Sequence, residues 1–339
     1  APRGRRRGAR RCGVPPRTLI VCPAQPGSRE GNRVTALRWA RILRALGHRV
    51  RITGEQVEPD ADLLVALHAR RSARAVAAFR RRHPERPLVV ALTGTDLYRD
   101  LPGSRAAARS LAAADRLVVL QPAARHALEP GLRRKVRVVY QGVERIARPG
   151  CPPRGRFQVC VLGHLRAVKD PLRVAWAARR LPAHSRLRIV HVGAALEAHL
   201  AGRARAESLR NPRYRWLGER PRARALALLT RSHLLVQASQ LEGGANAVGE
   251  AARHGVAILA SRVPGNVGLL GARHPGLFPV GDTRALARAL WQAESEPAFF
   301  ARLAQASRRL APRFDPAQER DAWARLLAEI HLAPASRSA

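Results

Sequence analysis

The sequence predicts an α/β protein made of two doubly wound domains, each a parallel sheet between layers of helices. Short apolar runs alternate with amphipathic helical patterns along residues 17–332, which is typical of parallel sheets. The stretch 234–260 shows the unit in full, as an apolar run, a glycine turn, a helical segment and a second apolar run. Proline and glycine interrupt the alternation between residues 146 and 156, and 339 residues are enough for two domains.

The first half begins with a buried strand and a helix that ends at Gly47. A second helix is predicted over residues 72–82, and a short one lies between the last two strands. Apolar runs predict strands over residues 18–22, 50–52, 62–68, 87–92, 116–120 and 136–140. We therefore expect an N-terminal Rossmann-like domain over residues 17–145, followed by a linker over residues 146–156.

The second half repeats this alternation, and we expect a C-terminal Rossmann-like domain over residues 157–332. Strands are predicted over residues 157–162, 187–192, 213–217 and 234–237 and from Val256 onward. Helices are predicted over residues 195–209, 222–231, 282–293, 297–310 and 316–332, and a helical segment that holds Val248 and Glu250 is predicted to end at Gly255. The glycine-rich stretch Ser261–Gly271 is predicted to be a loop at the edge of the sheet where ligands bind.

The chain is strongly basic, because 62 Lys and Arg against 24 Asp and Glu give a net charge of +38. Such a charge favours nucleic acid or an anionic surface as partner. However, nearly all cations are arginines spread along the whole chain, only Lys135 and Lys169 are lysines, and aromatic residues make up 4%. This composition indicates a bias toward arginine, so we expect no specific nucleic-acid partner.

Cysteine spacing and hydropathy argue against a metal-binding, a disulfide-bonded or a membrane-spanning protein. Cys12, Cys22, Cys151 and Cys160 form no Cys-x-x-Cys pair, so we expect free thiols, no bound metal and a cytoplasmic location. No run of about 20 apolar residues predicts a membrane span. Residues 1–16 hold an arginine run without an apolar core, which predicts a disordered basic arm rather than a signal peptide.

The turn after the apolar run Leu234–Val236 carries the strongest functional pattern. Gly243 and Gly244 precede a helical segment, whose free N–H groups favour a phosphate or a sugar oxygen. Glu242 and Glu250 lie eight residues apart, about 12 Å along a helix. That separation exceeds the distance between the two carboxylates of a glycosidase, and it suits two hydroxyl-rich parts of one long ligand.

This Glu-x7-Glu pattern resembles the donor site of retaining nucleotide-sugar glycosyltransferases with the GT-B fold (the family-4-like group). The resemblance implies two Rossmann-like domains facing a cleft, a C-terminal helix that crosses back, a UDP-sugar co-substrate and no cofactor. It implies that Glu242 contacts the donor sugar and Glu250 the ribose. The turn and helix start between them then contact the donor through Gly243, Gly244, Ala245 and Asn246.

A second segment, Gly163–Pro171, resembles the part of this family that binds the donor diphosphate. The resemblance assigns Arg166 and Lys169 to the leaving diphosphate, where two cations neutralise developing charge. These two residues and Glu242 are our candidate catalytic residues. Gly163 and Gly218 are further donor-binding candidates.

Loops at the ends of two N-terminal strands are the candidate acceptor side. The loop after the first strand provides Gly31, Asn32 and Arg33, and its glycines do not form the Gly-x-Gly-x-x-Gly fingerprint of dinucleotide sites. The turn after the fourth strand provides Thr93, Gly94 and Asp96, although Asp96 is nearly as well explained as a helix cap. Many family relatives have histidine where Thr93 stands, and this departure suits an acceptor that needs no deprotonation.

Five segments together resemble the selenosugar synthases of selenoneine biosynthesis more closely: "QPGSREGNRVTALRWARILRALGH", "ALTGTDLYRDL", "VLGHLRAVKDPLR", "QLEGGANAVGEA" and "SRVPGNVGLLG". The resemblance implies transfer of N-acetylglucosamine or a related hexose from a UDP-sugar to selenophosphate. Phosphate is lost and a 1-seleno-sugar forms, with functional coupling to an enzyme that produces selenophosphate. Arg29 and Arg33 are candidates to hold the phosphate of the acceptor.

Three alternatives stay open at this point. A retaining UDP-sugar glycosyltransferase with a lipid, thiol or sugar acceptor would use the same donor residues. A non-catalytic sensor would bind the nucleotide sugar without turnover. A nucleic-acid binder would rest on the net charge of +38 alone.

Overall fold

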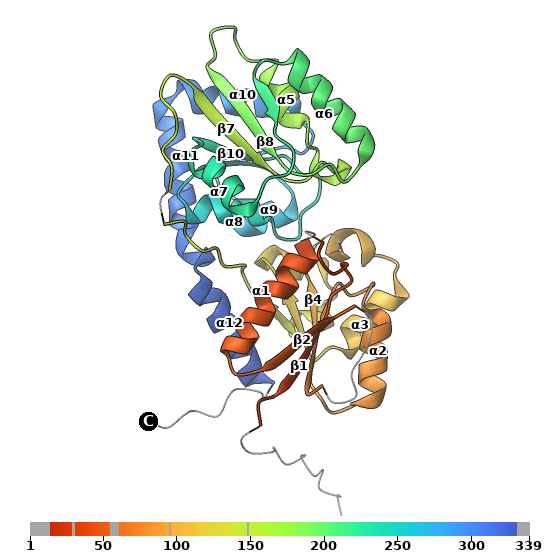
Figure 1. Ribbon diagram of the computed structural model, residues 1–339. Coiled ribbons are helices and arrows are strands. Elements are labelled where there is room, and N and C mark those ends of the chain that lie inside the picture. Colours follow the sequence, from red (N-terminus) through yellow and green to blue (C-terminus); the bar gives the residue numbers. More distant parts are fainter. Residues whose placement is uncertain (1–13, 29–30, 55–60, 95, 148, 331–339) are drawn as a thin grey trace, which may run out of the picture.

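The computed structural model describes residues 14–28, 31–54, 61–94, 96–147 and 149–330. It contains two six-stranded sheets, with strand orders β2-β1-β3-β4-β5-β6 and β12-β11-β10-β7-β8-β9. Every paired strand is parallel to its neighbour, and helices cover the faces of both sheets (Figure 1). The prediction of two doubly wound α/β domains is confirmed.

The first sheet and its helices come from the N-terminal part of the chain. Its elements are β1 (Arg17–Val21), α1 (Gly31–Ala45), β2 (Arg49–Thr53), β3 (Leu63–Leu67), α2 (Ala73–Arg82), β4 (Leu88–Leu92), η1 (Asp96–Asp100), α3 (Arg105–Ala113), β5 (Arg116–Val119), η2 (Pro122–Ala127), α4 (Pro130–Arg133) and β6 (Val136–Val138). Each strand coincides with a predicted apolar run, so local hydrophobicity placed this sheet correctly.

The second sheet and its helices come from the C-terminal part. Its elements are β7 (Phe157–Leu162), η3 (Ala167–Lys169), α5 (Arg173–Ala178), β8 (Leu187–Val192), α6 (Ala198–Arg210), β9 (Tyr214–Trp216), α7 (Arg222–Thr230), β10 (Leu234–Gln237), α8 (Asn246–Arg253), β11 (Ala257–Ser261), α9 (Pro264–Leu270), β12 (Leu277–Phe278), α10 (Thr283–Ser295), α11 (Pro297–Leu310), η4 (Ala311–Phe314) and α12 (Pro316–Glu329).

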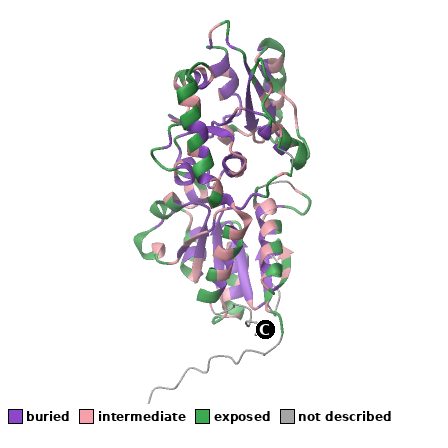
Figure 2. Cartoon of the chain, turned by 90° about the vertical axis from the view of Figure 1, so that its left-hand side faces the viewer, coloured by how far each residue is buried: buried purple, intermediate pink, exposed green. Residues whose placement is uncertain are grey.

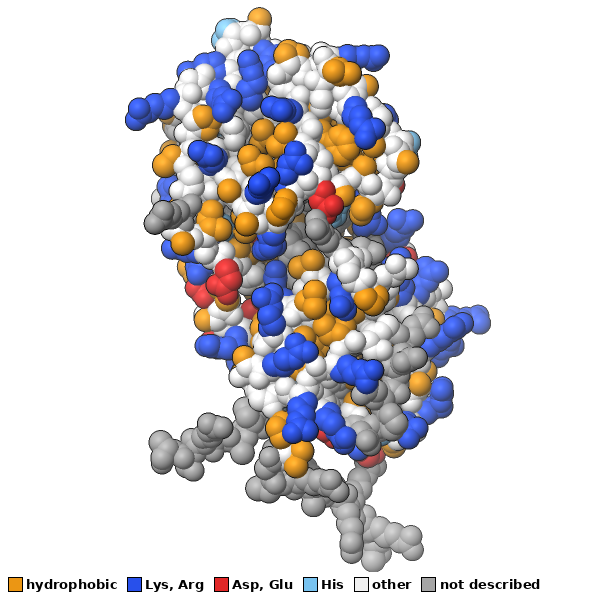
Figure 3. Space-filling model, viewed as in Figure 1, with side chains coloured by type: hydrophobic (Ala, Val, Ile, Leu, Met, Phe, Trp, Pro, Cys, Tyr) orange, Lys and Arg blue, Asp and Glu red, His pale blue; other side chains and the backbone are white. Residues whose placement is uncertain are grey.

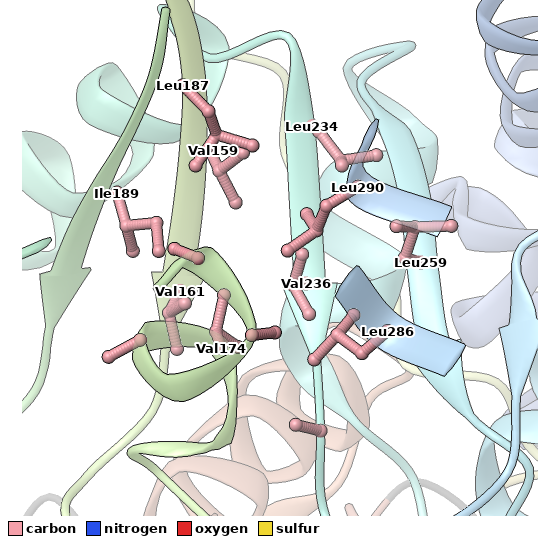
Figure 4. Packing of buried hydrophobic residues seen from close by; sticks show 14 of the residues in the cluster. Val159, Val161, Val174, Leu187, Ile189, Leu234, Val236, Leu259, Leu286 and Leu290 are labelled. Carbon is pink, nitrogen blue, oxygen red and sulfur yellow. The ribbon is translucent and has the colours of Figure 1, made fainter. Parts of the chain in front are cut away.

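The strands form the interior of each domain, because helices exclude water from both faces of a parallel sheet. Figure 2 shows buried strands inside a shell of partly exposed helices. In the second domain, Leu234, Val236 and Leu259 pack with Leu286 and Leu290 of α10 (Figure 4). Burying each such leucine stabilises the fold by about 1.5–3 kcal/mol. The sheet is therefore a rigid base for the loops at its edge.

The last helix, α12, leaves the second domain and packs against α1 of the first, as predicted (Figure 1). Trp323 of α12 contacts Trp39 of α1 edge to face, with ring centroids 4.9 Å apart. Glu319 accepts hydrogen bonds from the Trp39 indole at 2.9 Å and from the Gly142 backbone N–H at 2.7 Å. Burial raises the pKa of Glu319, so these donors offset the cost of removing its carboxyl group from water. The crossing helix thus joins the two domains.

One prediction was wrong: Ser261–Gly271 is not a loop, because α9 spans Pro264–Leu270. Proline is favourable in the first turn of a helix, and Gly271 ends the helix with a positive φ of 92°. The glycines inside the segment lower its helix propensity, which explains the wrong prediction. Tertiary packing overrides that propensity, since α9 packs against η2 of the first domain.

The distribution of charge agrees with the composition. On the face seen in Figure 3, Lys and Arg side chains are spread over both domains rather than gathered in one stripe. None of the helices within the described ranges is long and apolar enough to cross a membrane. Cys151 and Cys160 are free thiols, and the Cys22 thiol donates to the Ala24 carbonyl oxygen, whereas Cys12 lies outside the described residues.

Candidate functional site

The candidate donor and acceptor turns meet where the two domains touch. Thr93 and Gly94 follow β4, and Gly243 follows β10 through a short turn. A Cβ atom on Gly243 would lie 2.7 Å from the carbonyl oxygen of Gly94, closer than side chains approach backbone atoms. The two turns are therefore in backbone contact, and only glycine fits at this point.

Two other glycines make the same kind of contact between the domains. A Cβ on Gly244 would lie 2.6 Å from the Leu120 side chain, and one on Gly268 would overlap the Gln121 side chain. Gly243 and Gly244 were predicted from sequence as parts of a donor-binding turn. The structure shows that their Cα atoms face the first domain, so these glycines also set how closely the domains approach each other.

The side chain of Glu242 lies beside this contact and accepts several hydrogen bonds. The residue is buried, with 4% of its surface exposed. Its Oε1 atom accepts from Lys169 Nζ at 2.6 Å, from Gln237 Nε2 at 2.5 Å and from Ser239 Oγ at 2.6 Å. The Lys169 ammonium thus forms an ion pair with a buried carboxylate. The structure brings together two predicted catalytic residues that lie 73 residues apart in sequence.

Further polar residues hold the backbone around Glu242 and Ser239 in place. Ser261 Oγ donates to the Ser239 carbonyl, and Asn266 Nδ2 donates to the Ser261 carbonyl at 2.9 Å. Gly265 of α9 lies so close to the Glu242 backbone that its Cβ would be 2.1 Å from the Glu242 carbonyl oxygen. Helix α9, which was predicted to be a loop, therefore packs directly against the backbone of the candidate site.

The segment after β7 brings the predicted diphosphate-binding residues to the same place. Gly163, Lys169 and Gln237 line one small recess together with His191. The side chain of Arg166 is half-buried and has no hydrogen-bond or ion-pair partner among the described residues. Asp170, which follows Lys169, has a left-handed backbone with φ of 44°, a conformation that is often found at functional sites.

His191 lies beneath Gly163 as a neutral side chain. Its Nε2 lies 3.0 Å from the Gly163 carbonyl oxygen, which only accepts, so Nε2 donates and Nδ1 accepts from the Tyr214 hydroxyl at 2.8 Å. Burial lowers the pKa of His191 to about 4. A Cβ on Gly193 would overlap the Gly163 carbonyl, so His191 and Gly193 together fix the backbone of the predicted diphosphate loop.

Glu250 has a different environment from Glu242. It lies on α8 and is buried, and its Oε1 pairs with Arg222 of α7 at 2.8 Å. Arg38 of the first domain interacts electrostatically with both side chains. Ala245 and Asn246 lie at the start of α8, as predicted, and Gly218 follows β9 with a positive φ of 69°.

On the acceptor side, the predicted residues of the two loops contact each other. Thr93 Oγ1 donates to Asn32 Oδ1 at 2.5 Å, and the Gly94 N–H donates to Asp96 Oδ1 at 2.8 Å. Burial raises the pKa of Asp96, and its Oδ2 has no hydrogen-bond partner within the described ranges. The half-buried Arg33 has an Nε atom without a partner there, and the exposed Gly31 begins α1. Arg29 lies outside the described residues.

The sequence analysis missed three polar residues at strand ends. Gln237 ends β10 and Ser239 follows it, and both bind Glu242. His68 follows β3 with φ of 72°, lies within 3.3 Å of Asp100, and interacts electrostatically with Asp96. The signal that would have identified them is a polar side chain directly after a buried apolar run, at the carboxyl end of a parallel strand. Within the described part of the chain, no His, Cys, Asp and Glu side chains gather as a metal site.

Comparisons with known proteins agree with this architecture. Residues 144–310 match the profile of the family "Glycosyl transferases group 1". The fold is similar to the crystal structure of HepE from Anabaena in complex with UDP and glucose, with a TM-score of 0.72, 18% identity and coverage of 92% of this chain and 99% of that one.

Two further structures share the fold. Sucrose-phosphate synthase from Thermosynechococcus elongatus has a TM-score of 0.76 and 16% identity, covering 95% of this chain and 100% of that one. A UDP-forming α,α-trehalose-phosphate synthase from Burkholderia vietnamiensis has a TM-score of 0.64 and 17% identity, covering 88% and 78%. A search of curated proteins found no match. The predicted GT-B fold is confirmed.

Proposed function

We propose that this chain, which has a GT-B fold and whose residues 144–310 match the group 1 glycosyltransferase profile, transfers a hexose from a UDP-sugar to selenophosphate. The observation that carries the proposal is the buried carboxylate of Glu242, paired with Lys169, three residues after Arg166, whose guanidinium has no partner among the described residues. One site thus offers cations for a diphosphate and an acceptor-only group for sugar hydroxyls.

The donor would bind along the edge of the second sheet. Arg166 and Lys169 bind the diphosphate and neutralise the charge that develops as UDP leaves. Glu242 accepts hydroxyl groups of the hexose, and Glu250 accepts those of the ribose once Arg222 moves aside. Cations are supplied by the chain itself at this step, so the proposed reaction uses no cofactor.

The acceptor assignment rests on the five resembling segments and on the chemistry of the acceptor turn. Thr93 has no acid–base group, and its hydroxyl is already bonded to Asn32. Selenophosphate suits such a site because its selenium is already anionic and needs no general base. Arg33, whose Nε has no hydrogen-bond partner within the described ranges, is our candidate to bind the acceptor phosphate.

The reaction balances without a redox step. Selenium attacks the anomeric carbon on the face from which UDP departs, so the C–Se bond forms as the C–O bond to UDP breaks. Water then cleaves the P–Se bond and releases phosphate and the 1-seleno-sugar. We place the enzyme in the cytoplasm, functionally coupled to an enzyme that produces selenophosphate, with N-acetylglucosamine or a related hexose as the sugar.

One observation favours a second candidate, transfer to a hydroxyl-bearing acceptor. The buried Asp96 has an oxygen without a donor among the described residues, and a hydroxyl group would satisfy it whereas a fully ionised phosphate has no hydrogen to donate. The donor half of the reaction would be unchanged. The two candidates therefore differ only in the acceptor.

A direct assay tests the proposal. The protein is incubated anaerobically with UDP-N-acetylglucosamine and selenophosphate, and UDP and selenium-bearing hexose are measured by mass spectrometry. We expect the seleno-sugar from the native chain and at least 100-fold less from Lys169→Ala and Glu242→Ala. UDP release without a selenium product would reject selenophosphate and favour the second candidate. UDP binding without release from any UDP-sugar or acceptor would identify a sensor instead.

A further inference from the structure

Gln237 occupies a special position in the network around Glu242. It is the last residue of β10 and is 6% exposed, so its amide cannot be satisfied by bulk water. Nε2 donates one hydrogen to Glu242 Oε1 at 2.5 Å and the other to Ser239 Oγ at 2.8 Å. Ser239 then donates its own hydroxyl hydrogen to Glu242. Gln237 therefore acts on the carboxylate both directly and through Ser239.

All hydrogen bonds to the Glu242 carboxylate from the described residues end on one oxygen, Oε1. The other oxygen, Oε2, is left without a protein donor in this part of the chain. An ionised carboxylate only accepts hydrogen bonds, so Oε2 is the atom available to a sugar hydroxyl. The network thus fixes which oxygen faces the protein and which faces a ligand.

The three donors on Oε1 are not equivalent. The Lys169 side chain is 29% exposed and reaches in from the rim, whereas the Glu242 side chain is 5% exposed. A diphosphate carries more negative charge than one carboxylate, so it draws the ammonium group away from Glu242. Glu242 would then be a buried carboxylate that has lost its cation, a costly state unless other donors remain.

We propose that Gln237 is the positioning residue that keeps the Glu242 carboxylate hydrogen-bonded and correctly oriented after the donor diphosphate has taken Lys169. This inference rests on the proposed function. Gln237 and Ser239 are neutral and buried, so the diphosphate does not compete for them. Because one nitrogen supplies both hydrogens, a glutamine amide fits here and a carboxylate would repel Glu242.

The substitution Gln237→Glu tests the role of the amide donor. At pH 7.5 the introduced carboxylate cannot donate and faces Glu242, so we expect kcat to fall at least 100-fold. At lower pH the introduced carboxyl takes up a proton and can donate again. We therefore expect kcat relative to the native enzyme to recover about tenfold between pH 7.5 and pH 5.5.

Gln158→Glu is the matched control. Gln158 lies on the neighbouring strand β7, is 7% exposed, and donates to the Arg231 carbonyl and to Ser232 without contacting Glu242. The Gln158→Glu variant also introduces a buried carboxyl group, so any loss of activity caused by lower stability appears in both variants. We expect its kcat relative to native to stay flat with pH.

The assay uses the full chain with UDP-N-acetylglucosamine and a saturating acceptor, and calorimetry gives UDP affinity in parallel. We expect both variants to bind UDP within about threefold of native, because the amide acts on the sugar-binding carboxylate. Equal pH recovery in both variants, or no recovery in Gln237→Glu, would overturn the inference. A native enzyme that releases no UDP from any UDP-sugar would instead reject the proposed function.

Discussion

The donor turn of the second domain and the acceptor turn of the first touch each other, yet their carboxyl groups are held in opposite ways. Glu242 accepts from a cation and two neutral donors, all on one oxygen. Asp96 accepts a backbone N–H on Oδ1 and has no partner on Oδ2 among the described residues. The donor side is therefore prepared for a ligand before it binds, whereas the acceptor side depends on the ligand to complete it.

The largest effect is expected from a substitution that separates these two turns. In Gly243→Ala the new Cβ would lie 2.7 Å from the Gly94 carbonyl, and two backbones must separate to make room. We expect transfer to fall at least 100-fold with UDP affinity within about threefold of native. Gly202→Ala is the control, since that position on α6 is open. Steady-state kinetics measure the transfer rate and calorimetry measures the UDP affinity. A near-native transfer rate in Gly243→Ala would show that the contact is not required.

On the donor side, the stability of the fold depends on pH through His191. Burial lowers the pKa of His191 to about 4, against about 6.5 in the unfolded chain. Between these values only the unfolded state takes up the proton, so stability falls as the pH falls. From pH 7 to pH 5 we expect His191 to account for a loss of about 2 kcal/mol, or roughly 30-fold in the unfolding equilibrium.

Urea unfolding of the native protein and of His191→Gln at both pH values measures this effect. The glutamine cannot be protonated in this range, so its stability should depend less on pH by that amount. Equal pH dependence in the two proteins would show that His191 is not buried as a neutral ring.

On the acceptor side, Asp96→Asn distinguishes the two candidate acceptors by the sign of its effect. Asparagine replaces a carboxyl group by an amide that can donate to a phosphate oxygen, so we expect the KM for selenophosphate to fall about tenfold. For a hydroxyl acceptor that donates to Oδ2, the same substitution should raise the KM. Steady-state kinetics with each acceptor at saturating donor give the sign, and a higher KM for selenophosphate would contradict our first proposal.

The smallest expected effect concerns the second donor carboxylate. Arg222 pairs with Glu250 but is itself half exposed, so water screens the interaction. Removing it in Arg222→Ala should free Glu250 for the ribose and tighten UDP binding about threefold. Arg224→Ala, an exposed arginine on the same helix, is the matched control. Weaker UDP binding in Arg222→Ala alone would show that Arg222 contacts the nucleotide.

Local patterns were enough to predict most of the fold and to locate the segments that carry the candidate site. The apolar runs that became β1, β3, β4, β5, β7, β10 and β11 are almost fully buried, because each consists of residues that leave water together. The glycine turn with Glu242 and the segment with Lys169 were found for a similar reason, since spacing within a short segment is visible in the chain. Whether each predicted side chain binds a ligand is still a prediction.

Contacts between distant segments could be assigned only from the tertiary structure. The partners in Gly94–Gly243, Gln121–Gly268 and Lys169–Glu242 lie far apart in sequence, and their distances follow from how two sheets and a crossing helix pack. Segment 264–270 was mispredicted as a loop for the same reason, because packing against the first domain outweighs the helix propensity of its glycines. Local hydrophobic and turn preferences act within a few residues. The partners of buried polar groups, in contrast, depend on how segments that are distant in sequence pack together in the folded chain.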